Sequence, residues 1–253
     1  MDKFRVENKV AVVTGASSGI GRATAMALAE RGAQLALIDI NASGLQNVAE
    51  TIGCKECLCK YYISDVANYQ DLEATFKEIM KEFGRIDILV NVAGIWESVP
   101  FLEMSSDHFE RMLDVNLKGA FNSFKLSLPT MVKRRYGKIV SVSSLAGKQG
   151  SMSGGSHYAA SKGGLIALSA SLAREFGSNG ININVVCPGL IETPLLGPNG
   201  PSEKGRTGYT SQSAQKRPGQ PEEVAALIVF LASDAASHVT GQAWNICGGS
   251  RID

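Results

Sequence analysis

Residues 14–21 read Thr14-Gly15-Ala16-Ser17-Ser18-Gly19-Ile20-Gly21, and they join a short apolar segment to an amphipathic one. A strand, a glycine turn and a helix N-terminus form an anion site, because free N–H groups and the positive end of the helix dipole point at the ligand. Glycine also lets a pyrophosphate approach the backbone with no Cβ in the way. The stretch therefore predicts a dinucleotide-binding turn. Its G-x-x-x-G-x-G spacing is neither G-x-G-x-x-G nor a Walker A loop, and the glycines alone also fit a plain turn.

The segments around this turn alternate between short apolar stretches rich in branched residues and longer amphipathic ones. This alternation is typical of strand–helix units around a parallel sheet that is covered on both faces. We expect one α/β domain over residues 1–253, with a doubly wound parallel sheet. The predicted strands are 9–14, 34–39, 57–62, 86–91, 137–142, 181–186 and 243–246. The predicted helices are 19–31, 42–52, 69–83, 107–135, 158–176 and 221–232, with a break near Pro129 and N-caps at Asn68 and Ser106.

One irregular region interrupts the alternation, between Gly189 and Pro218. It is rich in Gly, Pro, Ser and Thr, and strand–helix material flanks it on both sides. Such a stretch inside a compact domain is more often a functional loop than a domain boundary. We therefore expect a substrate lid at about residues 190–218.

Charge and composition exclude several classes of protein. The chain has 25 Lys and Arg against 24 Asp and Glu, so it lacks the basic excess that a nucleic-acid partner requires. No apolar run approaches the roughly 20 residues that span a bilayer, and no apolar segment of signal-peptide type follows the charged residues at the start. A cytoplasmic protein without a membrane partner is expected.

The five cysteines are expected to be reduced, because an odd number cannot all pair within one chain. Cys54, Cys57 and Cys59 have a spacing that resembles a metal site. A tetrahedral zinc site needs a second Cys or His cluster, and Cys187 and Cys247 stand alone. No bound metal is expected.

Asp39 strengthens the nucleotide interpretation. It closes the second predicted strand, 18 residues after Gly21, where an acidic residue can hydrogen-bond both ribose hydroxyls of an adenosine. A carboxylate there would repel a 2′-phosphate, and Ser18 offers no cation for one. The sequence therefore favours NAD over NADP, although Asp39 could also simply end a strand.

Tyr158 and Lys162 lie four residues apart on a predicted helix, so they share a face. An adjacent ammonium favours the phenolate and would lower the pKa of Tyr158 from its usual value of about 10. Tyr158 could then act as a general base near neutral pH. Taken alone, a Tyr-x-x-x-Lys pair also fits an ordinary surface pair.

Five motifs in this order resemble the short-chain dehydrogenase/reductase family. They are 14–21, Asn91-Val92-Ala93-Gly94, Ser143-Ser144, Tyr158-x-x-x-Lys162 and Cys187-Pro188-Gly189. The resemblance extends from about Lys9 to Gly249. It implies a Rossmann-like sheet of about seven strands, a nicotinamide cofactor, and a homotetramer or dimer, with subunit contacts near Tyr158 and over 239–253.

The resemblance also implies roles for individual residues. Tyr158 is the general acid/base, Lys162 lowers its pKa and binds the nicotinamide ribose, Ser144 orients the substrate oxygen, and Asn116 holds a relay water; Ser143 is the competing assignment for Ser144. The expected cofactor-binding residues are Gly15, Ser17, Ser18, Gly19, Ile20, Gly21, Asp39, Asp65, Val66, Asn91, Ala93, Gly94, Tyr158, Lys162, Pro188, Gly189, Ile191 and Thr193.

Two positions depart from the family pattern. Val92 replaces the second Asn of the usual Asn-Asn-Ala-Gly motif, and the interval from Ser144 to Tyr158 is 14 residues, one more than is common. The extra residue lies in a loop that should border the substrate. The expected pocket residues are mostly apolar: Ile95, Trp96, Lys148, Gln149, Met152, Leu190, Leu195, Leu196 and Tyr209.

These features predict an NAD-dependent oxidoreductase that interconverts a secondary alcohol and a ketone. The first alternative is a 3-oxoacyl-thioester reductase that uses NADPH, although such proteins typically carry a basic residue near the glycine turn. A nicotinamide-binding regulator without chemistry is the second, and a sugar-nucleotide epimerase, which expects a longer chain, is the third. Neither the alcohol nor the direction of the reaction follows from the sequence.

Overall fold

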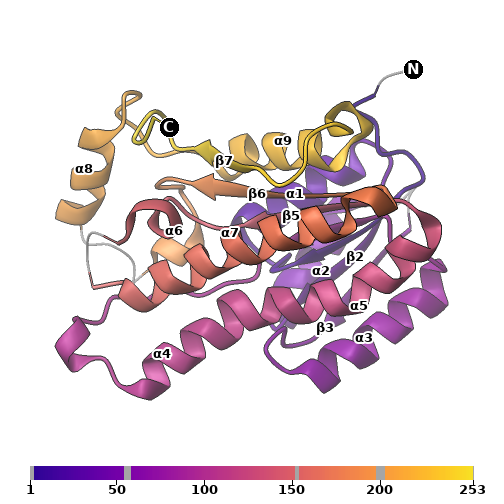
Figure 1. Ribbon diagram of the computed structural model, residues 1–253, viewed down its shortest axis with the longest axis horizontal. Helices are drawn as coiled ribbons and strands as arrows, with labels where there is room; N and C mark the ends of the chain where they lie inside the picture. The colour runs from indigo at the N-terminus through magenta and orange to yellow at the C-terminus, as the bar shows by residue number, and fades with distance from the viewer. Residues whose placement is uncertain (1–2, 54–57, 152–153, 198–202, 253) are drawn as a thin grey trace.

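Seven parallel strands form one sheet in the order β3-β2-β1-β4-β5-β6-β7 (Figure 1). The computed structural model describes residues 3–53, 58–151, 154–197 and 203–252. The order runs outward from β1 in both directions, so the sheet is doubly wound, and its switch point lies between β1 and β4. The strands are β1 (Val10–Thr14), β2 (Gln34–Asp39), β3 (Cys59–Ile63), β4 (Ile88–Asn91), β5 (Gly137–Val142), β6 (Ile181–Pro188) and β7 (Ala243–Ile246). The predicted fold class is confirmed.

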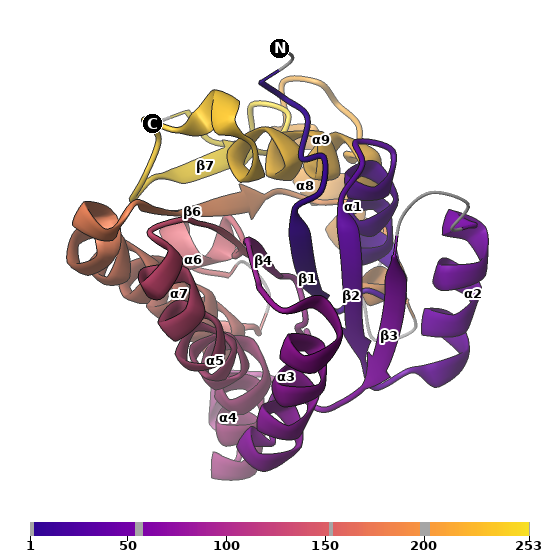
Figure 2. The ribbon, with the colours of Figure 1, turned by 90° about the vertical axis from the view of Figure 1, so that its right-hand side faces the viewer.

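Helices cover both faces of the sheet (Figure 2). One face carries α1 (Gly19–Ala29), α2 (Ala42–Ile52) and α9 (Pro221–Ala232). The other face carries α3 (Tyr69–Phe83), α4 (Ser106–Leu113), α5 (Gly119–Arg134) and α7 (Ser156–Phe176). Two further helices, α6 (Ala146–Gln149) and α8 (Glu203–Gln212), lie near the carboxyl ends of β5 and β6. Each face of the sheet therefore has its own hydrophobic core.

The apolar strands form the middle layer because both of their faces are covered. Every residue of β1, β4 and β5 is buried, as parallel strands between two helical layers should be. The edge strand β3 is half-buried to exposed. The alternation of short apolar and longer amphipathic segments thus identified the sheet and its coverage correctly.

The long helix predicted over 107–135 is wrong in its details. The chain forms α4, then a π-helical segment η2 (Asp114–Lys118), then α5, which continues through Pro129 to Arg134 without a break. Pro129 only leaves the carbonyl of Lys125 without its helical partner, and both residues are exposed, so water can replace that bond. The irregularity lies instead at η2, where the spacing gave no signal.

Other boundaries differ by a few residues. The N-cap of α4 is Ser105, one residue before the predicted one, while Asn68 caps α3 as predicted. Strand β3 begins at Cys59, and Cys54 and Cys57 lie outside the described residues. Helices α6 and α8 were not predicted, because both lie in polar, glycine-containing stretches with weak periodicity.

A buried carboxylate ties together the edge of the sheet opposite to the strand C-termini. Asp87, just before β4, is fully buried and accepts a hydrogen bond from the backbone N of Val10 at 2.9 Å. Its two oxygens lie 2.9 Å from Arg85 Nε and 3.3 Å from Arg134 NH2. One side chain therefore joins the starts of β1 and β4 to the end of α5.

We predict that Asp87→Asn lowers the free energy of unfolding by about 3 kcal/mol, because it leaves two arginines facing a neutral amide in a buried site. Urea denaturation measures this change. The matched control is Glu73→Gln, which removes a carboxylate from the exposed pair with Lys77 and should cost less than about 1 kcal/mol. Equal losses in the two variants would contradict the assignment.

Candidate active site

A cavity of about 750 Å³ opens at the carboxyl ends of the strands, on both sides of the switch point between β1 and β4. Ligands of open α/β sheets bind at this position. Most residues predicted to bind a cofactor or to act in catalysis line it. They are Gly15, Ser17, Ser18, Gly19, Ile20, Asp39, Asp65, Val66, Ala93, Gly94, Ser144, Tyr158, Lys162, Pro188, Gly189, Ile191 and Thr193.

The structure leaves no room for a side chain at Gly15 or Gly21 of the turn. A Cβ on Gly15, whose φ is +68°, would lie 2.6 Å from the backbone N of Ala93. A Cβ on Gly21 would lie 2.0 Å from the carbonyl oxygen of Gly15, so Gly21 packs α1 against the turn and is not among the described residues that line the cavity. The N-cap Ser18 makes no side-chain cap bond to any described residue. A pyrophosphate fits this bare helix N-terminus.

Asp39 is held at the turn by two backbone N–H groups. Its Oδ2 accepts from Ser17 N at 3.1 Å, and its Oδ1 accepts from Asn41 N at 3.0 Å. Ser17 was expected to contact the cofactor, but its backbone N–H donates to Asp39. The carboxylate stands at the cavity wall, next to Ile40.

Tyr158 lies in the first turn of α7 and faces Ser144, which follows β5. The side chains of Ser144 and Tyr158 are hydrogen-bonded. The hydroxyl of the neighbouring Ser143 donates instead to the carbonyl oxygen of Lys162 at 2.8 Å. This geometry favours Ser144 over Ser143 as the serine beside the tyrosine.

The pKa of Tyr158 differs from the sequence-based expectation. Burial raises the pKa of Tyr158 to about 12, although the hydrogen bond with Ser144 lowers it. Lys162 lies with its Nζ 5.8 Å from the tyrosine ring centroid and donates to the carbonyl oxygen of Val142 at 2.8 Å. The predicted lowering of the Tyr158 pKa is therefore not found in the protein by itself, because burial raises this pKa more than the hydrogen bond with Ser144 lowers it.

Lys162 is buried in the same cavity wall, and burial lowers the pKa of its ammonium to about 8. Gly94 makes room for it: a Cβ on Gly94 would lie 3.3 Å from Lys162 Nζ and 3.1 Å from Asn116 Oδ1. A side chain at position 94 would separate these two polar groups.

Asn116 lies behind the cavity wall, in the π-helical segment η2. Its Oδ1 accepts from Ile95 N at 2.8 Å, and its Nδ2 donates to Ile95 O at 3.0 Å and lies 3.2 Å from Ser161 Oγ. Asn91 is also buried, and its Nδ2 donates to Ser141 Oγ at 3.2 Å. Neither is among the described residues that line the cavity, so their observed contacts are to the protein.

The predicted substrate pocket is largely assembled. Ile95, Trp96, Gln149, Leu190, Leu195 and Tyr209 line the cavity. Lys148 does not, because its Nζ donates to Ala243 O at 2.8 Å. Met152 and the side chain of Leu196 lie outside the described residues.

Sequence reasoning missed one wall of the cavity. Four charged residues of α4 and η2 line this wall: Asp107, Glu110, Arg111 and Asp114. Val92, Gln212 and Ser250 also line the cavity and were not predicted. The sequence shows that residues 107–114 share a polar helix face. Because such a face is ordinarily exposed to water, the pattern did not indicate that these residues line a cavity.

The described residues show neither a metal-binding cluster nor a membrane-spanning helix. They contain no group of three or more His, Cys, Asp or Glu side chains placed to hold a metal ion. Within the same part of the chain, no helix combines the length and the apolar character needed to cross a membrane.

Comparison with known proteins places the chain among reductases and dehydrogenases. A family model described as Enoyl-(Acyl carrier protein) reductase matches residues 15–251. The 3-oxoacyl-[acyl-carrier-protein] reductase FabG of Thermotoga maritima is 39% identical over 97% of this chain and 99% of that protein. Oxidoreductase UcpA of Salmonella typhimurium is 36% identical over 98% of this chain and 96% of that protein.

Solved structures agree over the whole fold. Levodione reductase superposes with a TM-score of 0.91 at 33% identity, covering 97% of this chain and 98% of that one. A short-chain type dehydrogenase/reductase from Mycobacterium marinum superposes with a TM-score of 0.95 at 32% identity, covering 100% of this chain and 99% of that one.

The buried ammonium of Lys162 predicts a stability that depends on pH. Its pKa is about 8 in the folded chain against an ordinary value of 10.5, so below pH 8 folding must bury a charge that the unfolded chain keeps in water. We predict that Lys162→Met is more stable than the wild type at pH 7, by at most roughly 3 kcal/mol. This gain should fade as the pH rises from 8 to 10.5, because the lysine is then neutral in both states.

Urea unfolding at pH 7 and pH 10 measures the two differences. Lys125→Met, which removes an exposed lysine from α5, is the control and should change stability by similar small amounts at both pH values. A Lys162→Met difference that is the same at pH 7 and pH 10 would show that the ammonium carries no burial cost.

Proposed function

The chain belongs to the short-chain dehydrogenase/reductase family of oxidoreductases, which bind a nicotinamide cofactor, and from that premise we propose that it interconverts a ketone and a secondary alcohol by hydride transfer with NAD(H). The observation that carries this proposal is the hydrogen bond between Ser144 and the buried Tyr158, beside the buried Lys162, in a cavity that the glycine turn also lines. Proton transfer and nucleotide binding thus meet in one site.

The residues present fit a nicotinamide dinucleotide. Gly15 and Gly19 leave the backbone of the turn open, and Asp39 stands ready to accept hydrogen bonds from ribose hydroxyls. When bound, the cofactor supplies or accepts the hydride, and its oxidised ring is positively charged. Lys162 would bind the nicotinamide-side ribose, and Pro188 and Gly189 would border the ring.

Tyr158 would donate a proton to the ketone oxygen in the reducing direction, while Ser144 holds the same oxygen. A pKa of about 12 keeps Tyr158 protonated at neutral pH, which is the form that reduction requires. In the oxidising direction, a positive charge near the phenol would favour the phenolate. Asn116 would act behind the site by fixing the backbone of Ile95.

For the substrate, the relatives support a 3-oxoacyl thioester more strongly than a free secondary alcohol. Several similar proteins at 38–39% identity are named 3-oxoacyl-[acyl-carrier-protein] reductases. Such a substrate is also a ketone that becomes a secondary alcohol, so the proposed chemistry is unchanged. A smaller ketone is the second candidate, because the fold of levodione reductase superposes over almost the whole chain.

For the cofactor, the position of Asp39 supports NAD(H) over NADP(H). Its carboxylate is fixed by two backbone donors at the cavity wall, and a 2′-phosphate there would meet a like charge. The argument for NAD(H) from Asp39 does not depend on which ketone is the substrate. The proposal therefore includes a thioester reductase that uses NADH.

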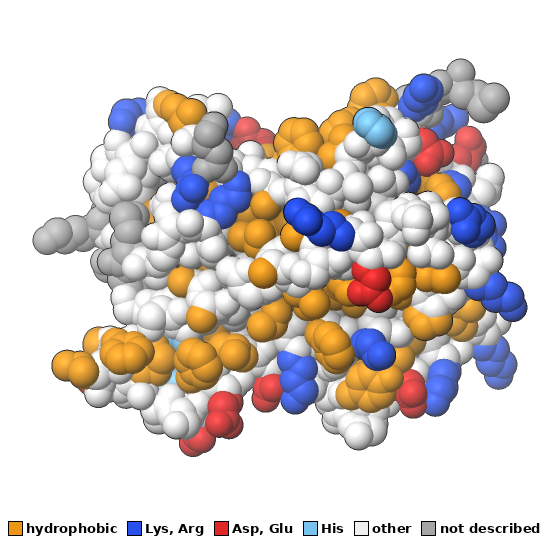
Figure 3. Space-filling model, viewed as in Figure 1, with side chains coloured by type: hydrophobic (Ala, Val, Ile, Leu, Met, Phe, Trp, Pro, Cys, Tyr) orange, Lys and Arg blue, Asp and Glu red, His pale blue; other side chains and the backbone are white. Residues whose placement is uncertain are grey.

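Three further features belong to the proposal. The chain would act as one catalytic unit, with 190–218 as a substrate lid, because Leu190, Leu195 and Tyr209 line the cavity. A cytoplasmic location is part of it as well. A homotetramer is supported by apolar side chains over α4 and α5 in Figure 3. The exposed ones are Phe109 in α4 and Phe121 in α5, and Phe101 and Leu102 are exposed just before α4.

We predict that Tyr158→Phe lowers kcat/KM for reduction of 3-oxobutanoyl-CoA with NADH by about 1,000-fold, because the proton donor is lost. The absorbance of the reduced cofactor measures turnover, and NADH fluorescence should report unchanged cofactor binding. Secondary alcohols with NAD⁺ provide the parallel assay if the thioester is not a substrate. A variant that keeps its turnover would show that Tyr158 is not the acid/base.

We predict that the wild type prefers NADH to NADPH, and that Asp39→Ala reduces this preference about tenfold, a change of about 1.4 kcal/mol. Ratios of kcat/KM for the two cofactors measure it. Glu50→Ala, which removes an exposed carboxylate from α2 outside the cavity, should leave the ratio unchanged. A wild type that favours NADPH would overturn the role of Asp39.

A further inference from the structure

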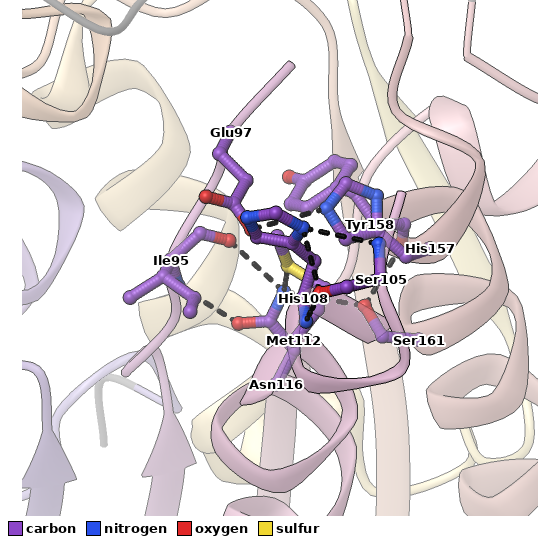
Figure 4. Close-up of polar contacts among 9 residues, drawn as sticks. All are labelled: Ile95, Glu97, Ser105, His108, Met112, Asn116, His157, Tyr158 and Ser161. Atoms are coloured by element: carbon purple, nitrogen blue, oxygen red, sulfur yellow. Dashed lines mark hydrogen bonds and ion pairs between the residues drawn. The ribbon is translucent and has the colours of Figure 1, made fainter. Parts of the chain in front are cut away.

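His157, the residue before Tyr158, is fully buried. Its Nε2 lies 3.3 Å from Oε1 of Glu97, in the loop that follows β4, and the side chain of Glu97 is 31% exposed. Figure 4 draws this pair together with Tyr158, Ile95 and Asn116. A histidine and a glutamate paired this close to the proposed acid/base have no part in the proton transfer described above.

The chemistry of the two groups sets the direction of this hydrogen bond. A carboxylate can only accept, so the Nε2 N–H of His157 donates to Oε1 of Glu97. Nδ1 of His157 is buried and has no hydrogen-bond partner among the described residues. Glu97 is therefore the side chain that holds the imidazole in place.

Glu97 belongs to a loop that is anchored by hydrogen bonds at several residues. Ala93 N donates to Thr14 Oγ1 at 3.3 Å, Ile95 is bonded through both backbone groups to Asn116, and Val99 N donates to the carbonyl oxygen of Gly154 at 2.7 Å. Glu97 adds a further anchor between Ile95 and Val99, through the hydrogen bond of its side chain with His157. The anchors hold Ile95 and Trp96, which form part of the cavity wall.

The other end of the pair is the first turn of α7, where Tyr158 is the third residue. The N-cap is Gly155, which has no side chain to cap the helix. Terminal turns of helices fray, because their first N–H groups have no partner within the helix. Glu97–His157 and Val99–Gly154 join this turn to the anchored loop. Adjacent helical residues diverge by about 100°, so the side chains of His157 and Tyr158 point in different directions from the same turn.

We propose that Glu97 and His157 are positioning residues that hold the first turn of α7, and with it the Tyr158 hydroxyl, in register with the cavity wall at Ile95 and Trp96. The proposal rests on the function proposed above for Tyr158. It assigns no contact with the reacting atoms to either residue. What the pair supplies is the alignment of the proton donor with a ketone oxygen held against the opposite wall.

Glu97→Ala tests the pair, because Glu97 is partly exposed and its removal should leave the fold intact. We expect kcat for 3-oxobutanoyl-CoA reduction to fall about tenfold through misalignment, with KM for NADH within about twofold of the wild type. Glu97→Gln should restore most of kcat, because its amide oxygen can accept the same hydrogen bond. His157→Gln breaks the same pair from the other side. The double variant Glu97→Ala/His157→Gln should have a kcat no lower than that of the slower single variant, since the losses of two residues that act as one unit do not add.

The control is Glu103→Ala, which removes an exposed carboxylate further along the same connection. A kcat for Glu97→Ala equal to that of Glu103→Ala would overturn the proposal. So would a Glu97→Gln variant as slow as Glu97→Ala, losses that add in the double variant, or a loss that falls equally on kcat and on KM for NADH, which would indicate a general structural defect.

Hydrogen exchange separates this proposal from the proposed function. In the protein without substrate, amides of residues 155–160 should exchange faster in Glu97→Ala than in the wild type or in Glu103→Ala. If the wild type reduces neither the thioester nor any ketone tested, the proposed function fails, and the pair is then judged by exchange alone. Equal exchange in the three proteins would overturn the positioning role.

Discussion

The site depends on a close backbone approach between the turn after β1 and the end of β4, which only glycine permits. A Cβ on Gly15 would stand 2.6 Å from Ala93 N, and a Cβ on Gly21 would stand 2.0 Å from the carbonyl oxygen of Gly15. A Cβ on Gly94 would stand 3.1 Å from Asn116 Oδ1 and 3.3 Å from Lys162 Nζ. The glycine turn and the first turn of α7 border the same cavity. A larger residue at Gly15 or Gly21 would force the backbone segments apart.

Burial of Tyr158 and Lys162 is the second constraint, and it opposes stability. Desolvation raises the pKa of Tyr158 to about 12 and lowers that of Lys162 to about 8, so Tyr158 is neutral near pH 7 whereas Lys162 is still mostly a buried ammonium. A neutral phenol suits proton donation to a ketone. The surrounding framework, including Asp87 and its two arginines at the far edge of the sheet, must supply the stability that a buried ammonium takes away.

Much of the fold was predictable, because parallel strands between two helical layers leave a strong alternation in the sequence. The glycine turn and Asp39 were identifiable for a related reason, since both sit at strand ends where the topology fixes their place. Three features could not be predicted from the sequence. The Tyr158 pKa depends on burial, which spacing on a helix does not report, and the Glu97–His157 pair joins residues 60 positions apart with no local pattern. The π-helical segment around Asn116 likewise left no periodic signal.

Direct transfer of hydride is the central claim, and isotopic labelling tests it most simply. NADH that carries deuterium at the transferable position of C4 is incubated with the protein and 3-oxobutanoyl-CoA, and the product is examined by mass spectrometry. The account predicts a 3-hydroxybutanoyl thioester with one deuterium on the new carbinol carbon, formed about 1,000-fold more slowly by Tyr158→Phe. A carbinol product without deuterium, or consumption of NADH without a carbinol product from this or any other ketone tested, would contradict it.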